Sequence, residues 1–328
     1  MVTFTGVYEL PHSIAVTPSC LSKSFRSRIA GRSMVLKTPA FVWGTDDRPH
    51  LVAPHVDHLP TQRGQGVGTL WEHGAPWGAI NSCNPSKRTF ETAWVNAVAL
   101  KFALPAGSFG YLDAINRLGP PHGGSVAELF RNIDSWFLEL LVWVGVSHDL
   151  DTDHLQPLAY GETPGEGLTI RSIESDGTLS SLMSASETRI YMARHQGVKL
   201  GTLRTLVKLV NDSTQPHDSH LLLREAHLAR RRGRLRRAVI DAGTATELAL
   251  AEWNVRSNGN KQPPRGRFAT LGWYVIEAKA VVPTNTMADL VNRRNDAVHK
   301  NLTPTPAQAI EAVRLAETIV HGLEPLPL

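Results

Sequence analysis

Cysteine is scarce in this chain, which limits how its fold can be stabilised. Only Cys20 and Cys83 occur among the 328 residues. Two thiols are too few for a disulfide framework or for a zinc site with four thiolate ligands. We therefore expect both cysteines to be reduced and to serve as ordinary residues.

Long apolar runs are missing as well, and so are internal repeats and low-complexity tracts. No stretch is long enough to cross a bilayer, and residues 1–4 do not begin the charged and then apolar pattern of a signal peptide. A hydrophobic content of 42% is nevertheless typical of a folded protein. We expect a cytoplasmic protein that has no membrane contact and, at this length, two domains.

The first part of the chain alternates strand-like segments with turn signals. Residues 98–104 alternate large apolar side chains with small or charged ones, which is typical of a half-buried strand. Shorter candidates lie at residues 2–8, 34–37 and 68–71. A helical apolar stripe at residues 126–144 predicts one long helix packed across the sheet. Because no helices alternate with the strands, we predict a sandwich or open barrel.

From residue 217 onward the pattern becomes all-helical. The polar segment 211–216 breaks the preceding structure, and Gly or Pro residues separate the later helices. Five helices are predicted, at residues 221–231, 235–255, 268–280, 286–300 and 305–322. We therefore predict an α+β protein, with a β-rich recognition or sensor domain at 1–210 and an antiparallel helical bundle at 217–328.

Positive charge is concentrated in the predicted bundle. From His217 onward the chain has 16 lysines and arginines against 11 aspartates and glutamates, a net charge of +5, whereas the whole chain carries +4. A basic domain suits an anionic partner such as RNA.

The most informative motif lies on the fourth helix of the bundle. Arg294 precedes His299 by five residues, in the order Arg-Asn-Asp-Ala-Val-His. Arginine is permanently cationic and can hold a phosphate through two parallel hydrogen bonds, while histidine titrates near neutrality and can transfer a proton. Together they could cleave RNA without a metal or another cofactor. The alternative is that both side chains cap and solvate the end of a helix.

The surroundings of the motif resemble a known family. Apolar helical segments lie at residues 236–250 and 269–278, the motif stretch spans 290–300, and a last apolar helix follows at 305–320. This succession resembles the HEPN superfamily, whose helical domains carry an arginine, a polar residue and a histidine in this order. The resemblance covers roughly the last third of the chain. In architecture alone, the fusion to a β-rich domain resembles the ApeA-like abortive-infection proteins of bacteria.

The resemblance implies an endoribonuclease. His299 would take a proton from a ribose 2′-hydroxyl or give one to the leaving 5′-oxygen, Arg294 would stabilise the phosphorane, and the product would carry a 2′,3′-cyclic phosphate. Asn295 would orient the imidazole or the substrate. The family also implies a homodimer with one composite cleft, controlled by a phage-derived trigger or by an antitoxin.

Three further charged residues are candidates for auxiliary roles. Arg293 and Asp296 lie beside the motif positions, and Glu247 lies on the second bundle helix, from which it can turn inward toward Arg293 or Arg294. Each of the three can equally belong to a structural ion pair.

A run of arginines forms the second candidate site. Six arginines occupy eight positions between the first two bundle helices, an arrangement that can bind RNA phosphates and make binding fall steeply with salt. They are Arg230, Arg231, Arg232, Arg234, Arg236 and Arg237. The alternative is a solvated loop whose arginines pair with nearby acids.

Other groupings do not predict a site. Residues 148–154 lack the glycine and the terminal glutamate of a calcium loop, and the histidines of 55–58 lie in a proline-bounded loop, so no metal is expected. Trp77 and Trp94 could stack on bases, but tryptophans of a β domain usually belong to its core. Two functions therefore remain open: an endoribonuclease, or a non-catalytic HEPN protein that binds RNA, a protein partner or a second copy.

Overall fold

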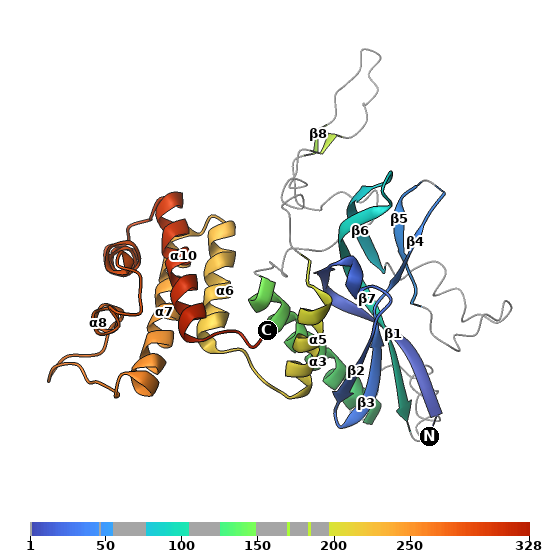
Figure 1. The fold of residues 1–328 in the computed structure, drawn as a ribbon, viewed down its shortest axis with the longest axis horizontal. Coiled ribbons are helices and arrows are strands. Elements are labelled where there is room, and N and C mark those ends of the chain that lie inside the picture. Colours follow the sequence, from blue (N-terminus) through green and yellow to red (C-terminus); the bar gives the residue numbers. More distant parts are fainter. Residues whose placement is uncertain are drawn as a thin grey trace, which may run out of the picture. The chain divides into compact units, whose positions relative to one another are not determined.

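The structure is a computed structural model of the chain, shown in Figure 1. It describes residues 2–45, 47–54, 77–104, 125–148, 169–170, 183–184 and 197–328. A β-sheet region precedes a helical region, which confirms the predicted α+β class. None of the described helices combines the length and the apolar character that crossing a lipid bilayer requires.

The chain divides into two compact units. The first consists of Met1–Leu141 and Thr152–Ser213, and the second of Val142–Asp151 and Thr214–Leu328. The division after residue 213 falls inside the polar segment 211–216. It therefore lies between residue 210, where the first predicted domain ends, and residue 217, where the second begins. The last residues of the long helix α3 (Ser125–His148) belong to the second unit, which the sequence did not indicate.

The main sheet of the first unit has five antiparallel strands. Their order is β1-β7-β3-β2, and β6 also pairs with the long strand β7. The strands are β1 (Val2–Val16), β2 (Ser24–Ile29), β3 (Arg32–Lys37), β6 (Gly78–Asn84) and β7 (Thr89–Leu104). Two-stranded pairs are formed by β4 (Ala40–Trp43) with β5 (Pro49–Val52), and by β8 (Thr169–Ile170) with β9 (Met183–Ser184). Where a sandwich or open barrel was predicted, the described residues form one open sheet and the separate β4–β5 and β8–β9 pairs.

Helices attach to this sheet through aromatic and amide contacts. Phe137 of α3 stacks on Tyr8 of β1, with ring centroids 4.1 Å apart, so α3 packs on the sheet as predicted. Asn211, the last residue of α5 (Leu200–Asn211), accepts hydrogen bonds from Ser27 of β2 and from the indole of Trp136. A short 3₁₀ turn, η1 (Pro18–Cys20), follows β1.

The second unit is a helical bundle built around α7. The long helices α6 (Asp218–Arg231), α7 (Leu235–Ser257) and α10 (Pro306–Leu323) lie side by side (Figure 1). The shorter elements α8 (Leu271–Glu277), η3 (Met287–Val291) and α9 (Asn292–His299) contact α7 and are seen nearly end-on in this view. Four fully buried alanines of α7 allow neighbouring helices to approach closely; they are Ala238, Ala242, Ala245 and Ala249.

Candidate functional site

The predicted motif lies on a helix that begins with a π-helical turn. η3 passes directly into α9, and the N–H of Asn292 donates to the carbonyl of Met287, five residues back instead of four. The sequence predicts the whole segment as one α-helix, because apolar spacing does not reveal the extra residue. Such turns are rare in proteins, and those that occur are often found at functional sites.

The stem of Arg294 lies across a glycine of α7. A Cβ atom added to Gly243 would stand only 2.7 Å from Cγ of Arg294, so no other residue type fits there without moving the arginine. One turn further along α7, Oε2 of Glu247 lies 3.7 Å from Nη2 of Arg294. The structure thus brings Glu247 and Arg294 together and fixes the direction of the arginine side chain.

The guanidinium of Arg294 keeps most of its hydrogen-bonding capacity. Its Nη1 donates to Oδ1 of Asn295 over a long 3.4 Å, its ion pair with Glu247 is longer still, and its buried Nε has no partner in the described residues. By contrast, Arg314 makes bonds of 2.6 and 2.8 Å to one carboxylate. An arginine has five N–H donors. The terminal nitrogens of Arg294, but not its buried Nε, are therefore in a position to bind an anion.

His299 is the last residue of α9, and its side chain is exposed. The helix ends because Asn301 adopts the left-handed conformation, with φ of 55°, which asparagine tolerates better than most residues. His299 makes no hydrogen bond to any described residue. Asp296, which could have oriented it, pairs with Lys300 at 2.8 Å. The imidazole is therefore free to meet a ligand from solvent.

The two ends of the motif do not touch each other within one chain. No described contact joins Arg294 to His299, and the two positions lie about 140° apart around the helix axis. Asn295 lies one turn before His299 on the same side of α9 and also touches Arg294. Arg293 is half-buried, and its buried Nε has no described partner.

The arginine run begins α7 beside the end of the motif helix. Nε of Arg236 donates to the carbonyl of Ala297 at 2.8 Å, and Arg234, Arg236 and Arg237 line a hollow of about 460 Å³ together with Thr303 of the α9–α10 loop. The two candidate sites, about sixty residues apart in sequence, are therefore neighbours. Sequence alone could not show this, because it depends on how α9 crosses α7.

Part of the arginine run is engaged in structural contacts. Nε of Arg237 donates to Oδ2 of Asp241 at 2.5 Å, and Asp241 is almost fully buried. Burial raises the pKa of the Asp241 carboxyl above its usual range, and the bond from Arg237 opposes that rise. Arg236 and Arg237 thus have roles in the fold, whereas Arg234 is exposed and lines the hollow.

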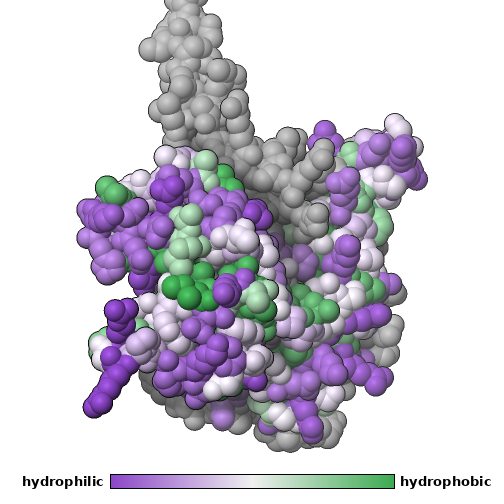
Figure 2. Space-filling view, turned by 60° about the vertical axis from the view of Figure 1, so that its left-hand side comes forward, coloured by the Kyte–Doolittle hydropathy of each residue, from purple (hydrophilic) through white to green (hydrophobic). Residues whose placement is uncertain are grey.

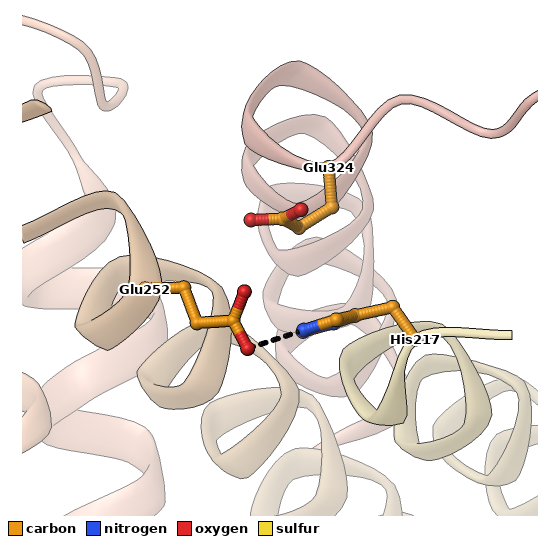
Figure 3. Close-up of side chains that lie close together, drawn as sticks. All are labelled: His217, Glu252 and Glu324. Atoms are coloured by element: carbon orange, nitrogen blue, oxygen red, sulfur yellow. Dashed lines mark hydrogen bonds and ion pairs between the residues drawn. The ribbon is translucent and has the colours of Figure 1, made fainter. Parts of the chain in front are cut away.

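A cluster at the other end of α7 has the composition of a cation site. The potential ligand atoms of His217, Glu252 and Glu324 lie within 4.8 Å of one another (Figure 3). Nδ1 of His217 accepts the N–H of Ser219 at the start of α6, so the proton of the neutral ring lies on Nε2 and is donated to Glu252 over 2.7 Å. Glu324 is paired with Arg256.

The atoms that would bind a metal are thus already engaged by a proton and a guanidinium. We name this group, His217, Glu252, Arg256 and Glu324, the polar clamp. It ties the start of α6 to α7 and to the end of α10. Its bonds explain it as a structural element, and none of its members belongs to the predicted motif.

The described candidates in the β-rich part of the chain do not form a site. Trp77 and Trp94 are buried and belong to the core, so they offer no surface for bases to stack on. The histidines of 55–58 and most of the 148–154 segment lie outside the described residues. Sequence reasoning missed Gly243, although a glycine inside an alanine-rich helix is a signal of close approach.

Comparison of the chain with protein-family models, with curated proteins and with solved structures finds no match. The geometry of Arg294, His299 and the arginine-lined hollow must therefore carry any functional conclusion.

Proposed function

We propose that the second unit is a HEPN-type bundle and that the protein is a metal-independent endoribonuclease, acting in the cytoplasm in anti-phage defence or in a toxin–antitoxin system. The observation that carries the proposal is the bonding of two side chains of α9, Arg294 and His299. Arg294 is positioned by Gly243 and Glu247, yet its terminal nitrogens make only contacts of 3.4 and 3.7 Å, and His299 is exposed without a hydrogen-bond partner in the described residues. The structural Arg314 of the same bundle, by contrast, makes bonds of 2.6 and 2.8 Å to one carboxylate.

The proposed reaction needs a base, an acid and a cation. A base removes the proton of a ribose 2′-hydroxyl, the 2′-oxygen forms a bond to phosphorus, and the bond from phosphorus to the 5′-oxygen breaks. An acid protonates that leaving oxygen, which leaves a 2′,3′-cyclic phosphate. His299 serves as base or acid, and Arg294 stabilises the charge that builds up on the phosphorane.

The motif of one chain, residues 294–299, contains a single histidine, which supports a homodimeric site. Arg294 and His299 of one chain do not touch, so a second motif helix could offer the missing acid or base to the same phosphate. Asn295, within reach of Arg294, orients the substrate. Arg234 and its neighbours in the run would hold flanking phosphates, which predicts a steep fall of affinity with salt.

The proposal is tested by cleavage of end-labelled RNA in EDTA, with mapping of the product ends. Native protein should cut and leave cyclic phosphates, whereas His299→Ala and Arg294→Ala should not cut. Arg314→Ala and His321→Ala, which alter exposed residues of α10, are the matched controls and should cut normally. Cutting by both motif variants at the native rate would contradict the assignment.

A second function is supported by the hollow alone. A bundle that uses Arg234, Arg236 and Arg237 to bind RNA without cutting it would also explain the basic surface beside Thr303. Expression in bacteria separates the two functions, because toxicity that disappears with His299→Ala requires the chemistry. Binding that depends on the arginines, with no cutting under any condition, would favour the binding protein.

A further inference from the structure

A groove of about 860 Å³ opens beside η3 and α9, and it shares no lining residue with the arginine hollow. The loop before α8, α8 itself and the η3–α9 helix form it, and its main lining residues are Arg267, Phe268, Trp273, Ile276, Asn292 and Asn295. Sequence reasoning assigned no role to this region apart from Asn295. The motif helix therefore contacts the arginine run through Ala297 and lines this separate groove through Asn292 and Asn295.

The apolar part of the groove is unusually exposed. Phe268 is 90% exposed and Ile276 is 60% exposed, and Trp273 lines the same groove. Figure 2, which brings the α8 side of the molecule forward, shows apolar side chains gathered among hydrophilic ones. Large exposed apolar groups beside a hollow are typical of a binding surface.

The polar part of the groove favours a nucleotide over a purely apolar partner. Glu277, the carboxylate in the lining, is paired with Lys261 at 2.8 Å, whereas Arg267 forms no salt bridge with a described residue. The groove is therefore net positive. The amides of Asn292 and Asn295 add hydrogen-bond donors and acceptors, which suit the edge of a base.

The groove also points toward the motif. Asn292, Asn295 and His299 follow the spacing i, i+3, i+7, so they form one stripe along α9. His299 lies about 6 Å further along the helix axis than Asn295. A base held between Phe268 and Asn292 would thus direct its own ribose and phosphate toward the imidazole.

We propose that this groove binds one unpaired nucleobase of a single-stranded RNA, stacked on Phe268 and Trp273, next to the phosphate that is cut. The inference rests on the proposed function for the identity of the polymer. It adds a substrate class, since a base in a duplex is stacked on its neighbours and cannot enter the groove.

The test is binding of a fluorescent single-stranded oligoribonucleotide to the full-length protein in EDTA, compared with the duplex of the same sequence. Both carry 2′-O-methyl groups, which remove the attacking hydroxyl and prevent cleavage during the measurement. Native protein should prefer the single strand. Phe268→Ala should weaken single-strand binding at least about fivefold, because stacking of one base contributes on the order of 1–3 kcal/mol, and should not change the salt slope. Arg267→Ala should reduce that slope. Val255→Ala, an exposed apolar residue of α7 outside the groove, is the control and should bind normally.

Several results would overturn the groove assignment. They are equal affinity for single strand and duplex, unchanged binding by Phe268→Ala, or conversion of a dimer to a monomer by that variant, which would make the groove a protein interface. Because the assay measures binding, it is independent of cleavage. A protein that binds through Phe268 but does not cut contradicts only the proposed nuclease, and one that cuts with unchanged sites and rate after Phe268→Ala contradicts only the groove.

Discussion

The polar clamp and the Arg294–His299 motif both contain an arginine and a histidine, but these side chains are bonded differently in the two places. In the clamp, His217 bonds through both ring nitrogens, and Arg256 is paired with a buried carboxylate. In the motif, His299 has no bond in the described residues and Arg294 has only long ones. Satisfied groups stabilise a fold, whereas fixed groups with free donors are available to a ligand. The comparison therefore separates residues that hold the bundle together from residues proposed to act.

The largest expected effect is loss of cleavage by His299→Ala. Removal of a general acid or base typically lowers the rate by about 10²- to 10⁴-fold. Thermal unfolding should be nearly unchanged, because the side chain is exposed and makes no described bond. Cleavage rates and melting temperatures of the same preparations check both parts. A destabilised His299→Ala protein would show that the motif belongs with the clamp.

For His217→Ala we expect the reverse, a loss of stability without a loss of cleavage. This change removes the cap of α6, leaves the N–H of buried Ser219 without an acceptor, and frees Glu252. We expect the free energy of unfolding to fall by about 1–2 kcal/mol, measured by chemical denaturation, with normal RNA cutting below the transition. Glu252→Gln keeps an acceptor for Nε2 and should lose much less. A large loss of cleavage in folded His217→Ala protein would refute the division of roles.

One buried and one largely buried histidine of α6, His220 and His227, sharpen the comparison through pH. Burial lowers the pKa of His227 to about 4, against the opposing charge of Glu317, and burial also lowers the pKa of His220. Because the unfolded histidine titrates near pH 6.5, the unfolded state binds more protons between pH 6.5 and about 4. The contribution of neutral His227 to the free energy of unfolding is therefore fully present above pH 6.5. It is lost as the pH falls through this window, and the loss is on the order of 1–3 kcal/mol.

Denaturation at pH 7.5, 6 and 5 measures this loss. His227→Gln should flatten the dependence, and His299→Gln, an exposed control, should leave it as in the native protein. An unchanged pH dependence in His227→Gln would show that the buried histidine is not its source.

The smallest loss of cleavage is expected from Gly243→Ala. The new methyl group would meet Cγ and Cβ of Arg294 and displace its guanidinium, which should lower cleavage about tenfold, since small displacements at a reacting centre are costly. The free energy of unfolding should also fall, by on the order of 1–3 kcal/mol, because Cβ of Arg294 is bonded to the α9 backbone and would lie only 3.2 Å from the added carbon. Gly322→Ala, where nothing lies within 4 Å, is the matched control in α10. Equal cleavage by both variants would mean that the position of Arg294 is unimportant.

Local patterns predict the order of elements better than their contacts. Apolar spacing and breakers such as Gly233 locate α3 and the bundle helices, and residue types alone single out Arg294 and His299. The arginine hollow, the clamp and the fit of Arg294 over Gly243 arise from contacts between segments far apart in sequence. No local pattern encodes such contacts. The chemistry-bearing residue types could therefore be proposed from sequence, but their partners could not.

The π-helical turn η3 decides where the motif helix tolerates a change of residue number. Five residues close this turn, where four close it in an α-helix, so the extra residue is taken up locally between the buried Leu290 and Val291 and the stripe of Asn292, Asn295 and His299. Deletion of one residue within Met287–Val291 would let an ordinary α-turn form and leave the direction of that stripe nearly unchanged. Insertion of one residue into α9 itself, between Asn292 and His299, would instead turn His299 away from Asn292 by about 100°, so the motif tolerates a change of residue number in η3 better than one in α9.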